Sequence, residues 1–220
     1  MSMRYAIFAF TLLLAINISL FNALAPHRTL AVSVLPVGKG DAVLVRSPGG
    51  RTLLIDTGAN ASVLRALGET LSFWQRRIDF IVLARPDEAG AGGLPEVLDR
   101  YSVDALLRTN ERGTKNREMV IASALSGINA PRQLQVERGM RLAFHDGVSV
   151  DILSPDSRFP SADDAAVLRI TYGMTSFVID ERKQPYNAIP GENSVTLSIA
   201  ADTPAATFIS NGKDIRTRPR

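Results

Sequence analysis

The sequence predicts one α+β sandwich preceded by an apolar N-terminal segment. Short aliphatic and β-branched runs separated by turn residues occur early in the chain and again in its C-terminal half, and stretches with helical spacing lie between them. The 220 residues, 45% of them hydrophobic, suffice for one well-buried core. We therefore expect an N-terminal segment at 1–25 and a single domain at 29–220.

The N-terminal segment has the length of a membrane anchor. Arg4 precedes an apolar run at 5–24, and about twenty helical residues at about 1.5 Å each match a bilayer core of about 30 Å. A buried core helix is the alternative. Ala23-Leu24-Ala25 resembles a signal-peptide cleavage site, but Pro26 follows it. We favour a retained anchor with the domain outside the cytoplasm, and a cleaved signal peptide would make the protein secreted.

The first half of the domain reads as a strand meander followed by βα units. Strands are expected at 29–37, 42–45 and 52–55, because glycine-rich turns separate them. A helix follows at 62–70, with Ser62 as its N-cap. The remaining elements of this half are a strand at 80–83, a helix at 94–101, a strand at 103–107 and a helix at 116–125.

The second half of the domain carries mostly strand signals. Asn211-Gly212 is a strong hairpin turn, and it pairs residues 207–209 with 214–216. The candidate strands are 141–144, 148–153, 166–172, 176–179, 195–199 and 206–210.

Composition excludes several chemistries. The chain has no cysteine, which rules out disulfides, Cys-ligated zinc and thiol nucleophiles. Its 25 Lys and Arg residues nearly balance 22 acidic residues. The net charge of +3 is therefore a weak indication of nucleic acid or anionic lipid as a partner.

Several ordered motifs carry a family resemblance. They are Val37-Gly38-Lys39-Gly40-Asp41-Ala42, then Leu54-Ile55-Asp56-Thr57-Gly58, then Arg85-Pro86-Asp87 with Gly92-Gly93-Leu94. In order and spacing they resemble the metallo-β-lactamase-like domain of ComEC-type competence proteins, which act in bacterial DNA uptake. The resemblance implies a metallo-β-lactamase-like αββα sandwich, with Zn or Mn bound at one edge by loops that follow strands.

The metal-binding signature of that family is lost here. It reads His-x-Asp-x-Asp-His, whereas this chain has Arg85-Pro86-Asp87-Glu88-Ala89-Gly90, so that only Asp87 remains. A guanidinium stays charged and repels a divalent cation. The chain has two histidines, His27 and His145, and the later stretch that bears further ligands in the family is missing after 179, which implies a shortened C-terminal lobe. We expect no metal cofactor and no catalytic residue.

Four residues mark the vestigial site. The resemblance assigns Asp56 to loop support, while the residues alone favour a turn cap, and it aligns Asp180 with a bridging carboxylate. We expect Arg85 to point into the former metal pocket, where Asp87, Asp180 and N–H groups near Gly92 can pair with it.

Other features each allow a functional and a structural interpretation. Asp87, Glu88 and Asp180 could hold Mg²⁺, but solvated loop acids are the favoured interpretation. The glycine loop at 90–93 could bind an anion or serve as a packing turn. His145 fits a hairpin turn better than a general base.

Two further segments also allow a functional and a structural interpretation. The basic C-terminus, with Lys213, Arg216, Arg218 and Arg220, could contact phosphate or form a frayed tail. Phe73-Trp74 is interpreted as a core or helix-packing anchor and not as a base-stacking platform.

Three functions remain open at this point. The first is a membrane-tethered, non-catalytic module for binding or assembly, with DNA or competence proteins as possible partners. The second is a metal-dependent hydrolase, a phosphodiesterase or nuclease, that uses unusual carboxylate ligands. The third is a fragment of a split competence protein. The lost signature favours the first.

Overall fold

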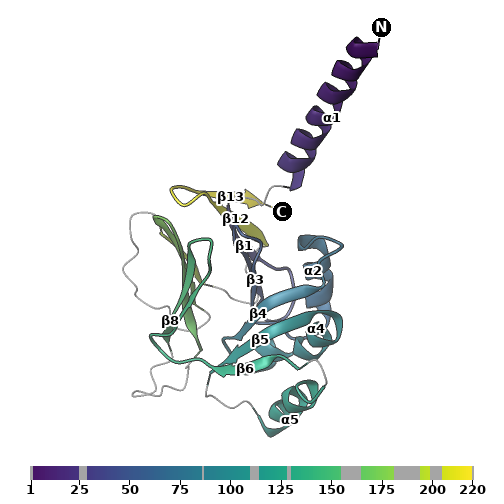
Figure 1. Cartoon of the computed structure of the whole chain (residues 1–220). Coiled ribbons are helices and arrows are strands. Elements are labelled where there is room, and N and C mark those ends of the chain that lie inside the picture. Colours follow the sequence, from purple (N-terminus) through teal and green to yellow (C-terminus); the bar gives the residue numbers. More distant parts are fainter. Residues whose placement is uncertain are drawn as a thin grey trace.

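The computed structural model describes residues 2–24, 29–85, 87–109, 114–127, 130–154, 165–180, 194–198 and 205–219. Two mixed β-sheets face each other, and helices cover the outer face of the larger one (Figure 1). The predicted α+β sandwich is therefore present. Three parts of the chain that the sequence analysis discussed lie outside the described residues. They are His27, Pro86 and the stretch at 181–193, from which we expect the ligand-bearing loop of the family to be deleted.

The larger sheet has eight strands in the order β13-β12-β1-β2-β3-β4-β5-β6. The first three strands along the chain pair antiparallel, as the meander predicted, and β3 to β6 pair parallel. The bounds are β1 (Leu30–Val34), β2 (Val43–Arg46), β3 (Thr52–Ile55), β4 (Arg77–Leu83), β5 (Ser102–Arg108), β6 (Arg132–Gln135), β12 (Ala206–Ser210) and β13 (Ile215–Pro219).

The smaller sheet has five strands in the order β11-β10-β9-β8-β7. Its inner face is apolar and packs against the larger sheet through residues such as Val150, Ile170 and Phe177, all fully buried. The bounds are β7 (Arg141–Ala143), β8 (Val148–Ser154), β9 (Val167–Tyr172), β10 (Thr175–Asp180) and β11 (Ser194–Ser198).

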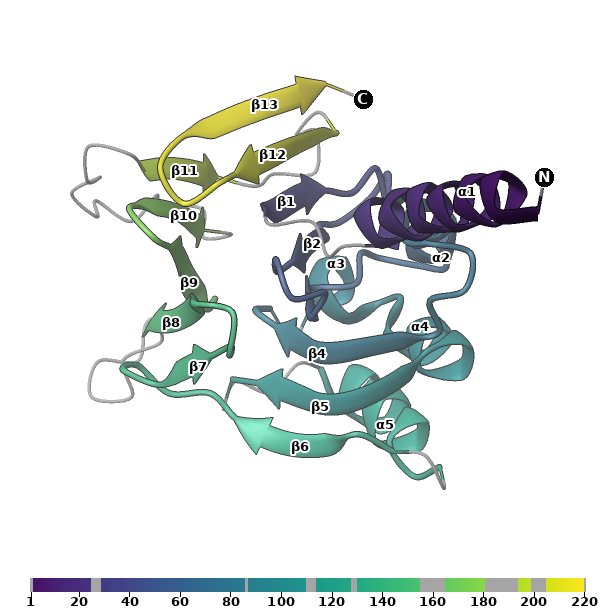
Figure 2. The ribbon, with the colours of Figure 1, turned by 45° about the horizontal axis from the view of Figure 1, so that its top comes forward.

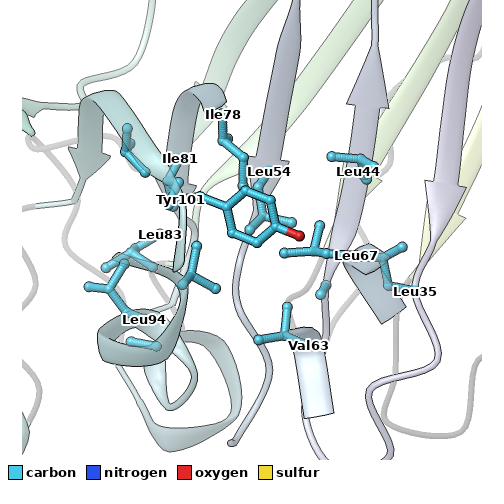
Figure 3. Close-up of a cluster of buried hydrophobic side chains, with 14 of the residues drawn as sticks. Leu35, Leu44, Leu54, Val63, Leu67, Ile78, Ile81, Leu83, Leu94 and Tyr101 are labelled. Carbon is cyan, nitrogen blue, oxygen red and sulfur yellow. The ribbon is translucent and has the colours of Figure 1, made fainter. Parts of the chain in front are cut away.

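The helices α2 (Ser62–Thr70), α3 (Glu88–Ala91), α4 (Leu94–Arg100) and α5 (Lys115–Ala124) lie along the larger sheet (Figure 2). Their apolar side chains meet the outer face of that sheet in a second core (Figure 3). Val63 and Leu67 of α2, for example, are fully buried beside Leu54 of β3.

The predicted αββα layering is only partly present. Among the described residues no helix covers the outer face of the smaller sheet. That face is polar, since Asp151 and Arg169 alternate with buried Val150 and Leu168. A polar outer face can stay in contact with water, so it needs no helix over it.

Three local predictions were wrong. Ser62 is the first residue of α2 and not its cap, and its hydroxyl donates to the carbonyl of Val37. The C-terminal residues up to Pro219 are not a frayed tail, because β13 pairs with β12 over five register positions. Phe73 and Trp74 are not core anchors, since they are 74% and 84% exposed.

The N-terminal segment forms α1 (Ser2–Leu24), a helix that projects away from the two sheets (Figure 1). Large apolar side chains between residues 3 and 18 are each at least half exposed. No helix within the described residues combines the length and the apolar character that crossing a bilayer requires. The membrane anchor expected at 5–24 stays a prediction.

Candidate functional site

The candidate site lies where β3 and β4 end. Asp56 follows β3 directly, is fully buried, and has a φ of 53°, in the left-handed region that few residues other than glycine adopt. Its Oδ1 accepts hydrogen bonds from the backbone N–H of Ala84 at 2.6 Å and of Arg85 at 3.4 Å. Asp56 therefore fixes the backbone at the end of β4, and this backbone sets the position from which the Arg85 side chain extends.

The guanidinium of Arg85 lies between two carboxylates. Its Nη2 is 3.0 Å from Oδ2 and 3.3 Å from Oδ1 of Asp87, and its Nη1 is 3.5 Å from Oδ2 of Asp41. The Arg85 side chain is only 24% exposed. A fixed cation thus occupies the place where the family resemblance puts the first metal ligand, with an acid on either side.

Asp41 is the member of this site that sequence reasoning missed. It is 4% exposed, and its Oδ1 accepts no hydrogen bond from the described residues. Burial raises the pKa of Asp41 above its usual value; the charge of Arg85 opposes this rise, and that of Asp87 adds to it. The signal was available in the sequence, because Asp41 belongs to the first motif of the resemblance.

The loop at 87–93 packs against two other loops through backbone atoms. Asp41 donates its N–H to the carbonyl of Ala89 at 3.2 Å, and Thr57 donates to the carbonyl of Gly90 at 2.6 Å. A Cβ on Gly90 would lie 2.6 Å from the carbonyl oxygen of Arg85 and 2.7 Å from Oδ2 of Asp56. The last histidine of the family motif therefore has no room at residue 90 unless this backbone moves.

Residues 90–93 of the same loop have the hydrogen bonding of a packing turn, the interpretation that the sequence favoured. Each of these four residues already donates its N–H within the protein. Gly90 donates to Oδ1 of Asp87, Ala91 to the Asp87 carbonyl, Gly92 to the Glu88 carbonyl and Gly93 to the Gly58 carbonyl. The segment is a packing turn, and it contains α3 with Asp87 as its N-cap.

Asp180 lies at the same side of the sandwich as the site. Asp180 ends β10, is fully buried, and pairs in register with Val167. The N–H of Ala166 donates to the carbonyl of Ala84 at 2.9 Å, which joins the start of β9 to the end of β4. Asp180 therefore belongs to the same edge of the sandwich as Arg85.

His145 lies away from this site, and Glu88 pairs with a residue outside it. His145 is exposed in the turn between β7 and β8, and its neighbour Asp146 accepts from the N–H of Gly49 at 2.6 Å. That contact places the turn at the opposite end of β3 from Asp56. The carboxylate of Glu88 lies 3.8 Å from the guanidinium of Arg117.

The donors present do not fit the metal centre of the resembled family. No group of three or more His, Asp or Glu side chains suited to a metal ion occurs in the described part of the chain. Arg85 also places a positive charge at the position of the first ligand.

No protein-family model matches the chain, and no curated protein matches it. Solved structures similar to the chain include metallo-β-lactamase proteins. One is a metallo-β-lactamase with a HARLDQ motif from Cronobacter sakazakii, at 18% identity, a TM-score of 0.48, and coverage of 80% of this chain and 66% of that one.

Two further similar structures belong to other proteins. Zn²⁺-bound PqqB from Methylobacterium extorquens is 14% identical with a TM-score of 0.45, over 63% of this chain and 48% of that one. A diphosphatase of the PhnP family is 17% identical with a TM-score of 0.46, over 71% and 67%. The chain thus spans about half the length of PqqB. At these scores the likeness supports no conclusion about a site or an activity.

Proposed function

We propose that this chain is a non-catalytic module with a metallo-β-lactamase-like architecture, which α1 holds at a membrane. One observation carries the first part of the proposal. The guanidinium of Arg85 lies 3.0 Å from Asp87 and 3.5 Å from Asp41, where the resembled motif has its first metal ligand. An arginine in this position neutralises the carboxylates, but it activates no water.

Packing of the neighbouring loop supports the same proposal. Gly90 stands at the position of the last histidine of the motif and has no space for a side chain. Two of the expected ligands are thus replaced, one by a cation and one by a close backbone contact. The module would then act through its surface, as a binding or assembly element.

Metal analysis together with thermal unfolding tests this proposal. A ligand that binds only the folded state raises its stability with the logarithm of its concentration. Zn²⁺ or Mn²⁺ at millimolar concentration is expected to leave Tm unchanged, and the purified chain is expected to hold far less than one metal ion per molecule. About one tightly held ion per chain, or metal-dependent hydrolysis of a phosphodiester, would instead favour the alternative, a hydrolase with carboxylate ligands such as Asp41 and Asp87.

The exposed apolar side chains of α1 support the membrane part of the proposal. Side chains such as Phe8, Phe10 and Leu13 are 69%, 66% and 62% exposed, and apolar surface of this extent is stabilised by lipid. The full chain is expected in the membrane fraction, and a variant that lacks residues 1–24 in the soluble fraction. Equal solubility of both without detergent would contradict the tether.

The proposal extends to DNA uptake, and the order of the motifs alone supports this extension. DNA or competence proteins are then the partners, and the alternative is that the chain is one part of a split competence protein. Neighbouring reading frames that encode several membrane helices would support the split protein. Absence of DNA binding by the purified chain in a mobility-shift assay would remove DNA as a direct partner.

A further inference from the structure

Two aromatic side chains lie exposed on the surface between α2 and β4. Phe73 and Trp74 form an edge-to-face pair with ring centroids 5.1 Å apart, and they are 74% and 84% exposed. The guanidinium of Arg76 lies 5.7 Å from the Phe73 ring centroid. We call residues 72–76 the aromatic loop. Exposure of two large aromatic rings is costly in water, so the loop has the character of a contact surface.

Sheet register places the aromatic loop and the start of β1, the first strand after α1, at the same end of the strands of the larger sheet. β1 is antiparallel to β2, β2 is antiparallel to β3, and β3 is parallel to β4, so that β1 and β4 run in the same direction. Their first residues, Leu30 and Arg77, therefore lie at the same end of the strands. The aromatic loop ends immediately before Arg77, and α1 ends six residues before Leu30.

Charged side chains surround the aromatic pair. Arg76, Arg77 and Arg100 are exposed at this end of the strands, and the N–H of Ser102 donates to the carbonyl of Arg76 at 2.9 Å, which holds the end of α4 beside the loop. Asp104 pairs with Arg77. Asp99 and Glu69 are also exposed nearby. The surface is therefore amphipathic and close to neutral, with arginines next to the aromatic rings.

We propose that the aromatic loop inserts into the headgroup region of a phospholipid bilayer beside α1. Trp and Phe rings occupy this depth because the boundary between headgroups and acyl chains accepts both their apolar and their polar parts. Arg76 and Arg100 would contact lipid phosphates. The proposal rests on the membrane tether of the proposed function, and it adds a second contact that fixes the tilt of the domain on the lipid surface.

The single tryptophan of the chain makes the test direct, because its fluorescence reports Trp74 alone. The full chain is bound to vesicles of phosphatidylcholine with phosphatidylglycerol, and sedimentation with the vesicles is measured first. Phosphatidylcholine brominated near the carbonyl end of its acyl chains is then substituted for the plain lipid. Insertion predicts a blue shift of the emission and about a twofold loss of intensity with the brominated lipid.

A relocated tryptophan provides the matched control. Trp74→Phe combined with Met119→Trp moves the only tryptophan to α5, where residue 119 is 64% exposed. Figure 1 shows α5 at the end of the domain far from α1. This variant is expected to sediment with the vesicles but to show no quenching by the brominated lipid.

The outcomes separate the loop from the tether. Sedimentation of the full chain without quenching of Trp74 overturns the present proposal and leaves the tether intact. Failure to sediment overturns both. A blue shift that follows protein concentration without lipid would assign the loop to contacts between copies of the chain, which also overturns the proposal.

Discussion

Reconstruction of the family motif should destabilise the protein without restoring hydrolysis. The perturbation is Arg85→His with Ala89→Asp and Gly90→His. A Cβ at residue 90 lies 2.6 Å from a carbonyl oxygen, and overpacking of this kind costs about 1–3 kcal/mol. Removal of the Arg85 guanidinium leaves buried Asp41 without its cation, at about 1–3 kcal/mol.

The two costs share one loop and are not strictly additive, so we expect a total loss of about 2–5 kcal/mol. Urea unfolding at pH 7 measures this loss directly, and a phosphodiester assay with Zn²⁺ or Mn²⁺ checks activity. Gly68→His with Arg65→His is the matched control, because a Cβ on Gly68 meets nothing within 4 Å and Arg65 is exposed. Unchanged stability of the triple variant would show that Arg85 is merely solvated. Activity above a blank of buffer and metal would refute the reasoning.

Two carboxylates should give opposite pH dependences. Burial acts to raise the pKa of Asp79, but hydrogen bonds from Thr52 and Arg51 together hold it below its ordinary value of 3.8. Asp79→Asn should therefore cost about 1–3 kcal/mol at pH 7, a deficit that shrinks as pH falls through and below 3.8; a deficit that stays constant would contradict the ionised role of Asp79. The pKa of Asp41 is instead raised by burial, so the wild-type chain should lose stability relative to Asp41→Asn as pH rises above 3.8. Urea unfolding between pH 3 and pH 7 measures both slopes, and a gain relative to Asp41→Asn over that rise would refute the second prediction.

The parts of the fold that the sequence predicted are those specified by local patterns. The meander at 29–55 has turn glycines between apolar runs, and the hairpin at Asn211-Gly212 has a strong two-residue turn signal. The exposure of Trp74 could not be predicted in this way, because burial depends on which distant segment covers a residue. The same holds for the outer face of the smaller sheet, over which the described part of the chain places no helix.

The candidate site shows the same division. Arg85 and Asp87 are two residues apart, so their pairing followed from the motif. Asp41 is 44 residues away from Arg85, and backbone contacts between loops bring it there, including the bond from Asp41 to the carbonyl of Ala89. In a single sequence, such contacts are marked only by the glycines of these loops and by the motif that contains Asp41.

The outermost strand of the larger sheet bears on how neighbouring copies of the domain would meet. β13 pairs with β12 on one side, and among the strands that the structure describes it is an edge strand of the larger sheet. Arg216 and Arg218 are exposed on this strand, and Pro219 closes it. Like charges and a residue without an N–H oppose the addition of a further strand. If α1 tethers the domain to a membrane, as proposed, neighbouring copies are concentrated in two dimensions, where lateral strand pairing leads to aggregation. Arg216 and Arg218 would then keep crowded copies of this domain apart.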